Sequence, residues 1–130
     1  MEWNAGKPWY HGSPSKLTRL RIGSTITQDR DLARIFSHKP GLVSQDVDAT
    51  GNRILKHTGT RPGYLYRLAE PVKPAEIEPH PASTMGAGQE WLTKREFQVE
   101  LVEPTTPIPE EVLNAEEVTV LSRRYIARTD

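Results

Sequence analysis

The sequence predicts an α+β fold: a split, mainly antiparallel β-sheet core with one or two short helices. Eleven prolines and nine glycines among 130 residues favour many short elements joined by turns. Apolar residues alternate in several short runs, as in half-buried strands, while one segment of the first half shows a clear helical period. Strands do not alternate with long helices along the chain, which argues against a doubly wound parallel sheet.

The first half of the chain contains two predicted strands and one predicted helix. Residues 8–13 place aromatic side chains before a His-Gly turn, and residues 24–27 are rich in β-branched side chains. Apolar residues at helical spacing predict an amphipathic helix within residues 28–37, and Thr27 can cap it. Residues 42–62 are polar and show no sustained period, so we expect a long loop or lid there.

The second half is predicted to hold four strands and a short helix. The predicted strands are residues 63–69, 89–93, 97–102 and 118–127. Residues 71–88 are rich in proline and small residues, which indicates a long loop. Pro109 suits the first position of a short helix that continues to Ala115.

Composition indicates one domain covering residues 1–130 and excludes several functions. Lys plus Arg and Asp plus Glu are both 17, so a zero net charge removes the electrostatic argument for nonspecific nucleic-acid or membrane binding. The absence of cysteine excludes disulfides, thiolate catalysis and cysteine-ligated metals. With no signal-peptide pattern and no apolar run of about 18 residues, we expect a cytoplasmic protein without a membrane partner.

Two residues are candidates for chemistry. His11 ends an aromatic strand, and Gly12 after it permits close approach of the backbone to a ligand, while Ser13 adds a hydroxyl. A histidine that only bonds a neighbouring carbonyl would explain this pattern nearly as well. Glu90 lies where a glycine-rich loop meets a strand, so it can face a cleft and stabilise positive charge. A glutamate on the surface of a strand is the alternative.

The remaining histidines give no positive signal for a site. His38 and His57 lie in polar stretches, so we expect both to be solvated, and His80 between two prolines is expected in a loop. Because no two histidines have the spacing of metal ligands, we expect no metal.

Three segments, in chain order, resemble the motifs of the ADP-ribosyltransferase superfamily, on the side of diphtheria toxin and the poly(ADP-ribose) polymerases. Tyr-His-Gly-Ser at residues 10–13 resembles the first motif, and residues 24–27 with the helix after them resemble the second. Gln-Glu-Trp-Leu-Thr at residues 89–93 resembles the third motif, where the glutamate begins a strand. Small bacterial members such as the rifamycin-modifying transferases share the short length. The resemblance spans residues 9–102.

The resemblance implies a mono-ADP-ribosyltransferase that uses NAD as co-substrate and releases nicotinamide. His11 would donate a hydrogen bond to the ribose, and Glu90 would stabilise the oxocarbenium-like cation, so these two are the implied catalytic residues. The residues implied to hold NAD are His11, Gly12, Ser13, Thr25, Thr27, Phe36, Tyr66 and Gln89.

One position departs from the family pattern. The second motif usually supplies a tyrosine that stacks on nicotinamide, and the corresponding position here is Thr25 or Ile26. Phe36 can supply one aromatic wall instead, and Tyr64 or Tyr66 the other.

The acceptor is open: a protein, a nucleic acid or a small molecule, contacted by the loop at residues 79–88. One alternative is an NAD glycohydrolase toxin, for which an antitoxin or inhibitor protein is an expected partner. Another is a non-catalytic module that binds NAD, ADP-ribose or a protein. An RNA 2′-phosphotransferase is disfavoured, because that branch normally adds a winged-helix domain for which this chain is too short.

Overall fold

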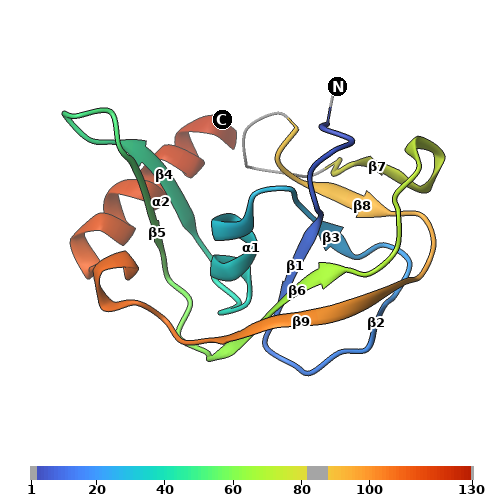
Figure 1. Cartoon of the computed structure of the whole chain (residues 1–130). Coiled ribbons are helices and arrows are strands. Elements are labelled where there is room, and N and C mark those ends of the chain that lie inside the picture. The colour runs from blue at the N-terminus through green and yellow to red at the C-terminus, as the bar shows by residue number, and fades with distance from the viewer. Residues whose placement is uncertain (1–2, 82–87, 130) are drawn as a thin grey trace.

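The computed structural model describes residues 3–81 and 88–129, with side chains described as far as residue 123. Within these residues two α-helices and nine strands follow one another among short 3-10 turns (Figure 1). In chain order these elements are β1 (Tyr10–Ser13), β2 (Arg19–Leu20), β3 (Thr25–Ile26), α1 (Arg30–Phe36), β4 (Val43–Val47), β5 (Arg53–His57), β6 (Gly63–Leu68), η1 (Pro74–Glu76), β7 (Ile77–Pro79), β8 (Trp91–Thr93), β9 (Phe97–Thr105), η2 (Pro109–Glu111) and α2 (Ala115–Thr129).

The strands form two sheets and a separate hairpin, and every pair of named strands is antiparallel. One sheet has the order β1-β6-β9-β2, the other β3-β8-β7, and β4 pairs with β5. A bridge between Tyr10 and Thr27 joins the two sheets where β1 passes the end of β3. The predicted α+β class with mostly antiparallel sheets is confirmed at this level, and the structure has two helices in the described residues.

The main core lies between the two sheets. Its buried residues are Trp9, Leu20, Ile26, Leu68, Ile77, Trp91 and Phe97. Trp9 occupies the centre, with its ring edge-on to Trp91 at 5.9 Å and to the half-buried Trp3 at 5.3 Å. Edge-to-face aromatic pairs add roughly 0.5–1.5 kcal/mol beyond the burial of their area, so this stack helps to hold the N-terminal segment on the core.

Helix α1 covers the outer side of β1 and packs on the β4–β5 hairpin. Leu32 and Ile35 of the helix are fully buried against Val43 and Leu55 of the hairpin. The predicted helix is thus confirmed, but its predicted cap is wrong. Asp29, not Thr27, is the N-cap, and its carboxylate accepts from the backbone N–H of Leu32 at 3.1 Å.

The predicted loop at residues 42–62 is wrong in its first part, because β4 and β5 form a hairpin there. Asp48 builds the turn by accepting hydrogen bonds from the backbone N–H groups of Thr50 and Asn52, each at 2.9 Å. Gly51 follows with a φ of 87°, a conformation that favours glycine. The polar residues of the hairpin obscure the alternation of buried and exposed positions in the sequence. In β5 the buried positions are Leu55 and His57.

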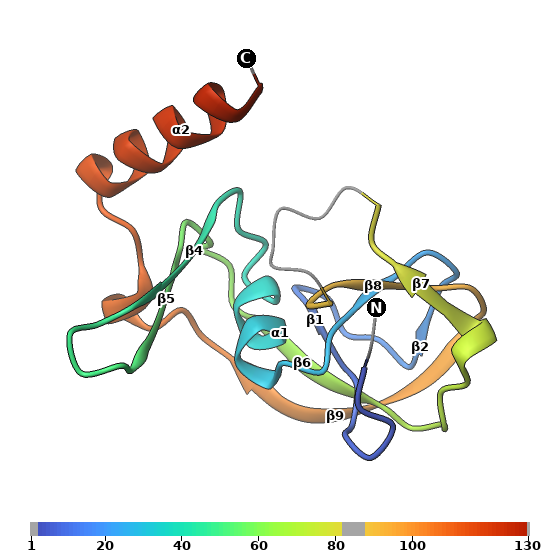
Figure 2. The same cartoon turned by 90° about the horizontal axis from the view of Figure 1, so that it is seen from above.

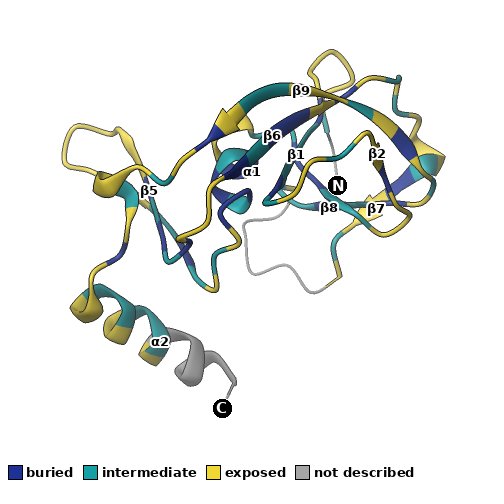
Figure 3. Ribbon diagram, turned by 90° about the horizontal axis from the view of Figure 1, so that it is seen from below, coloured by how far each residue is buried: buried dark blue, intermediate teal, exposed yellow. Residues whose placement is uncertain are grey.

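The predicted strand at residues 118–127 is also wrong, because this segment belongs to α2. Asn114 and Glu117 form a reciprocal capping pair: each backbone N–H donates to the other side chain, at 3.1 Å and 2.7 Å. The predicted helix from Pro109 to Ala115 is only the short turn η2. Figures 2 and 3 show that α2 projects from the β4–β5 end of the molecule, with exposed residues along its described part.

Part of the predicted loop at residues 71–88 is ordered into η1 and β7, and β7 pairs with β8. His80, just after β7, donates its backbone N–H to the carbonyl of Glu90 at 3.0 Å, which extends this pairing toward the start of β8. Residues 82–87 of that prediction, which also belong to the expected acceptor loop, lie outside the described residues.

Candidate functional site

A pocket of about 260 Å³ brings together segments from all three motifs. It lies between β1, the end of β3, helix α1 and the residue before β8. Its lining residues are Tyr10, His11, Gly12, Thr25, Thr27, Ala33, Phe36 and Glu90. Six of these were predicted to act on NAD, although up to 79 positions separate them along the chain, from His11 to Glu90. The Tyr10–Thr27 bridge and the β3–β8 pairing produce this convergence.

The imidazole of His11 is fixed by a hydrogen bond from its Nδ1 to the carbonyl oxygen of Thr25, at 2.7 Å. Because a carbonyl only accepts, Nδ1 carries the proton. Burial lowers the pKa of His11 below its ordinary value, although the bond to Thr25 acts in the opposite direction. The ring is therefore neutral at pH 7 and presents the lone pair of Nε2. This tautomer reverses the expected role, because Nε2 would accept a hydrogen bond from a hydroxyl and not donate one.

Gly12 is required by packing. A Cβ at this position would lie 1.9 Å from the carbonyl oxygen of Ala33 and 2.6 Å from the backbone nitrogen of Ser37. Tyr10 directs its backbone N–H and C=O to Thr27. The two-residue alternation of a strand turns the N–H and C=O of Gly12 to that same edge, where it lines the pocket. These two groups can bind a carboxamide.

The aromatic walls of the pocket are Phe36 and Tyr10. Phe36 was predicted for this role, and Tyr10 was missed because the motif suggested only its histidine and glycine. Tyr66 is placed elsewhere: its ring is buried, and its phenol oxygen accepts from the backbone N–H of Leu17 at 2.6 Å. Tyr64 lies beside Tyr66, with ring centroids 6.4 Å apart, and does not line the pocket either.

Two other predicted residues lie next to the pocket without lining it. The Ser13 hydroxyl is buried and accepts from the backbone N–H of Ser15 at 3.0 Å, which stabilises the turn after β1. Gln89 forms a paired amide contact with Gln45 of β4, at 2.9 Å and 3.1 Å. Since Gln89 directly precedes Glu90, this contact ties the backbone at Glu90 to the hairpin.

The contact between Gln45 and Gln89 belongs to a longer polar chain that ends at α1. Arg53 of β5 donates to the Gln45 side chain at 3.1 Å and pairs with Asp29 at 2.6 Å. Asp29 in turn caps α1, which carries Phe36 of the pocket. The hairpin, missed in the sequence, thus connects two walls of the site.

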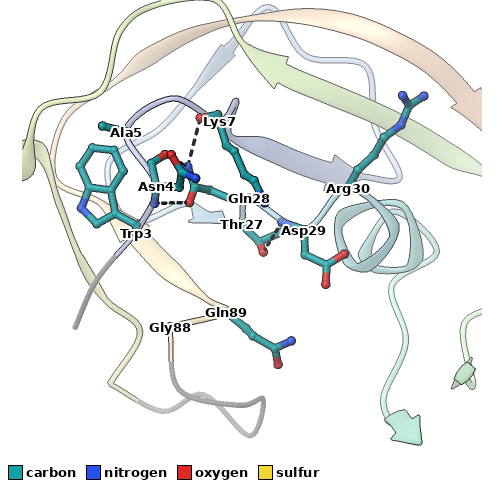
Figure 4. Close-up of a pocket in the computed structure, with 10 residues that line it drawn as sticks. All are labelled: Trp3, Asn4, Ala5, Lys7, Thr27, Gln28, Asp29, Arg30, Gly88 and Gln89. Carbon is teal, nitrogen blue, oxygen red and sulfur yellow. Dashed lines mark hydrogen bonds between the residues drawn. The ribbon is translucent and has the colours of Figure 1, made fainter. Parts of the chain in front are cut away.

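A second, larger cavity of about 840 Å³ adjoins the first (Figure 4). Thr27 lines both cavities, and Gln89 lines the larger one beside Glu90. The N-terminal segment forms its other side. The carboxamide of Gln28 holds that segment in place: it accepts from the N–H of Asn4 at 2.9 Å and donates to the carbonyl oxygens of Asn4 and Lys7 at 2.6 Å and 3.0 Å.

The expectation that His38 and His57 are solvated is wrong. Both are fully buried, and their rings stack on each other with centroids 5.4 Å apart. His38 donates from Nδ1 to the carbonyl of Arg61 at 2.7 Å, and His57 accepts from the N–H of Gly59 at 3.0 Å. Burial lowers the pKa of both rings. Both residues lie in polar stretches of the sequence, so their burial is apparent only from the fold.

Comparison with known proteins gives no family for this chain: no protein-family model, curated protein or solved structure matches it. Within residues 3–81 and 88–129, no three His, Asp or Glu side chains gather as a metal site would require. Over the same residues, neither helix has the length and apolar character needed to span a membrane.

Proposed function

We propose that this protein is an NAD-dependent mono-ADP-ribosyltransferase, which transfers ADP-ribose to an acceptor and releases nicotinamide. One observation carries the proposal: His11, Gly12, Phe36 and Glu90, from three separate segments, line a single pocket. The resemblance of the three motifs implies the same four residues. Their convergence supports a shared site.

The arrangement suits cleavage of the bond between nicotinamide and ribose. Phe36 and Tyr10 offer apolar faces to the nicotinamide ring, and the backbone of Gly12 offers a donor and an acceptor to its carboxamide. The bond electrons leave with nicotinamide, and the ribose carbon takes positive charge, as in glycoside hydrolysis. The Glu90 carboxylate can stabilise that charge, and Nε2 of His11 can accept from a ribose hydroxyl.

The same site can complete the transfer. The acceptor nucleophile adds to the ribose carbon and loses its proton, which Glu90 can take as a general base. With water in place of the acceptor, the product would be free ADP-ribose. No metal or second cofactor is needed for atoms and charges to balance.

The test is to incubate the full chain with NAD labelled in the adenosine part and to follow nicotinamide release and transfer of label. We expect both to occur with the native chain. Replacing Glu90→Gln should lower the rate of nicotinamide release by about a hundredfold or more, since loss of one electrostatic stabiliser typically costs this much. Glu78→Gln, at an exposed position of β7, is the matched control and should leave the rate unchanged.

The outcomes separate the alternatives. Release of nicotinamide with free ADP-ribose as the sole product would indicate a glycohydrolase. Binding of NAD without any release, unaffected by Glu90→Gln, would indicate a non-catalytic binding module. A folded protein that neither binds nor cleaves NAD would refute the proposal.

A further inference from the structure

The larger cavity next to the pocket has a chemistry of its own. Its lining residues are Trp3, Asn4, Ala5, Lys7, Thr27, Gln28, Asp29, Arg30, Gly88 and Gln89. They include one large aromatic ring, three carboxamides and three charged side chains. At about 840 Å³ the cavity falls in the range that accommodates a ligand with several rings or phosphates, whereas the smaller pocket of about 260 Å³ does not.

Its charge balance favours an anion. The Asp29 carboxylate is already neutralised by Arg53 at 2.6 Å. In Figure 4 the guanidinium of Arg30 points away from the other lining side chains, and Arg30 pairs with Glu103 at 3.8 Å. The side chain of Lys7 instead runs from the N-terminal segment toward Thr27, the residue shared by the two cavities (Figure 4). The ammonium of Lys7 forms no ion pair with any residue that the structure describes.

Trp3 gives the cavity a stacking surface. One side of the indole is engaged edge-on by Trp9, at 5.3 Å, and the residue remains half-exposed where it lines the cavity. The three hydrogen bonds of the Gln28 carboxamide fix the backbone at Asn4 and Lys7, so the segment that carries the ring and the cation is held at the cavity. Such pre-organisation lowers the entropic cost of binding.

We propose that this cavity binds a nucleotide, with the base against Trp3 and the phosphates at Lys7. A planar base, a phosphate and amide-bonding edges match the indole, the ammonium and the carboxamides respectively. The nucleotide has two possible sources: the ADP half of NAD, which the smaller pocket cannot hold, or a separate nucleotide that accepts ADP-ribose. The assignment to NAD rests on the proposed function. The presence of a nucleotide site does not depend on that function.

The test is calorimetric titration of the full chain with ADP, which lacks the nicotinamide riboside and so does not need the smaller pocket. We expect saturable binding that Lys7→Gln weakens about tenfold, because one charge-assisted contact to phosphate is lost. Lys16→Gln, at an exposed lysine outside the cavity, is the matched control and should bind as the native chain does. Trp3→Phe should bind nearly as well and Trp3→Ala about tenfold more weakly, with circular dichroism checking that each variant is folded.

Competition then distinguishes the two sources. If ADP displaces NAD and acts as a competitive inhibitor of nicotinamide release, the cavity holds the ADP half of NAD. If ADP binds equally well in the presence of saturating NAD, the cavity holds a second nucleotide. No saturable binding of ADP, or equal affinities for the native chain, Lys7→Gln and Lys16→Gln, would overturn the inference. Nicotinamide release is measured separately, so failure of the nucleotide site and failure of the proposed reaction are distinguishable.

Discussion

At position 12 the backbone of β1 lies directly against the backbone of α1. The atoms that a Cβ would meet are a carbonyl oxygen and an amide nitrogen, at Ala33 and Ser37, and neither can rotate away as a side chain would. A glycine there therefore fixes the distance between the strand that carries His11 and the helix that carries Phe36. One residue without a side chain sets the width of the pocket.

Gly12→Ala should therefore destabilise the fold by about 3 kcal/mol or more, since overpacking that moves backbone is among the costlier substitutions. Urea unfolding at neutral pH measures the change. Gly41→Ala is the control, because its Cβ would meet only the Thr58 hydroxyl at 3.7 Å, an ordinary contact. A Gly12→Ala protein as stable as Gly41→Ala would show that β1 and α1 are less tightly packed than described.

The protonation of His11 gives a second prediction at this scale. The bond to Thr25 uses Nδ1–H, so only the neutral ring leaves Nε2 free to accept from ribose. Burial lowers the pKa of His11, so the neutral form persists through pH 7. The kcat/KM for nicotinamide release should be flat at pH 7 and above, and its acid limb should lie below the ordinary histidine pKa of about 6.5. His11→Gln should reduce the rate at every pH and lose this acid limb. An unchanged rate for the variant would exclude His11 from the site.

At the scale of elements, the β4–β5 hairpin connects the segment at Glu90 to helix α1. It holds Gln89 through Gln45 and holds the cap of α1 through Arg53 and Asp29. Gln45 and Arg53 were missed in the sequence, because both lie in a polar stretch that looks like a loop. The positioning of Glu90 depends on this missed element.

Gln45→Ala should leave the fold intact and lower kcat for nicotinamide release several-fold, with KM changed much less. The physical reason is that the backbone at Glu90 loses its tie to β4, whereas the faces that bind NAD remain. Steady-state kinetics on the purified variant measures the split. Gln98→Ala, at an exposed glutamine of β9, is the control. Equal changes in kcat for both variants would reject the positioning role of Gln45.

The elements also show what sequence could and could not predict. Strands around His11 and Glu90 were found because their ends carry aromatic and β-branched residues in alternation. Helix α1 was found by its apolar period. The β4–β5 hairpin had one detectable signal, the Asp48–Gly51 turn, and α2 had the capping pair Asn114 and Glu117. The buried pair His38 and His57 had no detectable signal in the sequence, since its burial results from packing between distant segments.

At the scale of the whole molecule, three buried or half-buried histidines make stability depend on pH. Burial lowers the pKa of His11, His38 and His57 in the folded state. The histidines of the unfolded chain therefore bind protons near pH 6.5, whereas those of the folded chain do not. This difference favours unfolding as the pH falls. Well above that value all three are neutral in both states, and they contribute no pH dependence.

The free energy of unfolding should fall between about pH 7 and pH 5, by up to about 1.4 kcal/mol per pH unit for each histidine. Carboxylates whose pKa is lowered, such as Glu111 beside Arg34, act only at more acidic pH, so this window belongs to the histidines. Urea unfolding at several pH values measures the slope. In His57→Asn the amide oxygen can replace Nδ1 as acceptor for Gly59 but does not titrate, so the slope should decrease. An unchanged slope would contradict the account.

The three tryptophans of the chain form one continuous stack, from Trp3 through Trp9 to Trp91. Light absorbed by tryptophan is therefore emitted from a single place, the junction of the two sheets. Two of the rings are buried, whereas Trp3 is half-exposed at the edge of the larger cavity. Unlabelled protein thus carries an optical probe with two readings. Loss of the packing between the sheets would change the emission of the buried pair, and a ligand at the cavity would change it through Trp3.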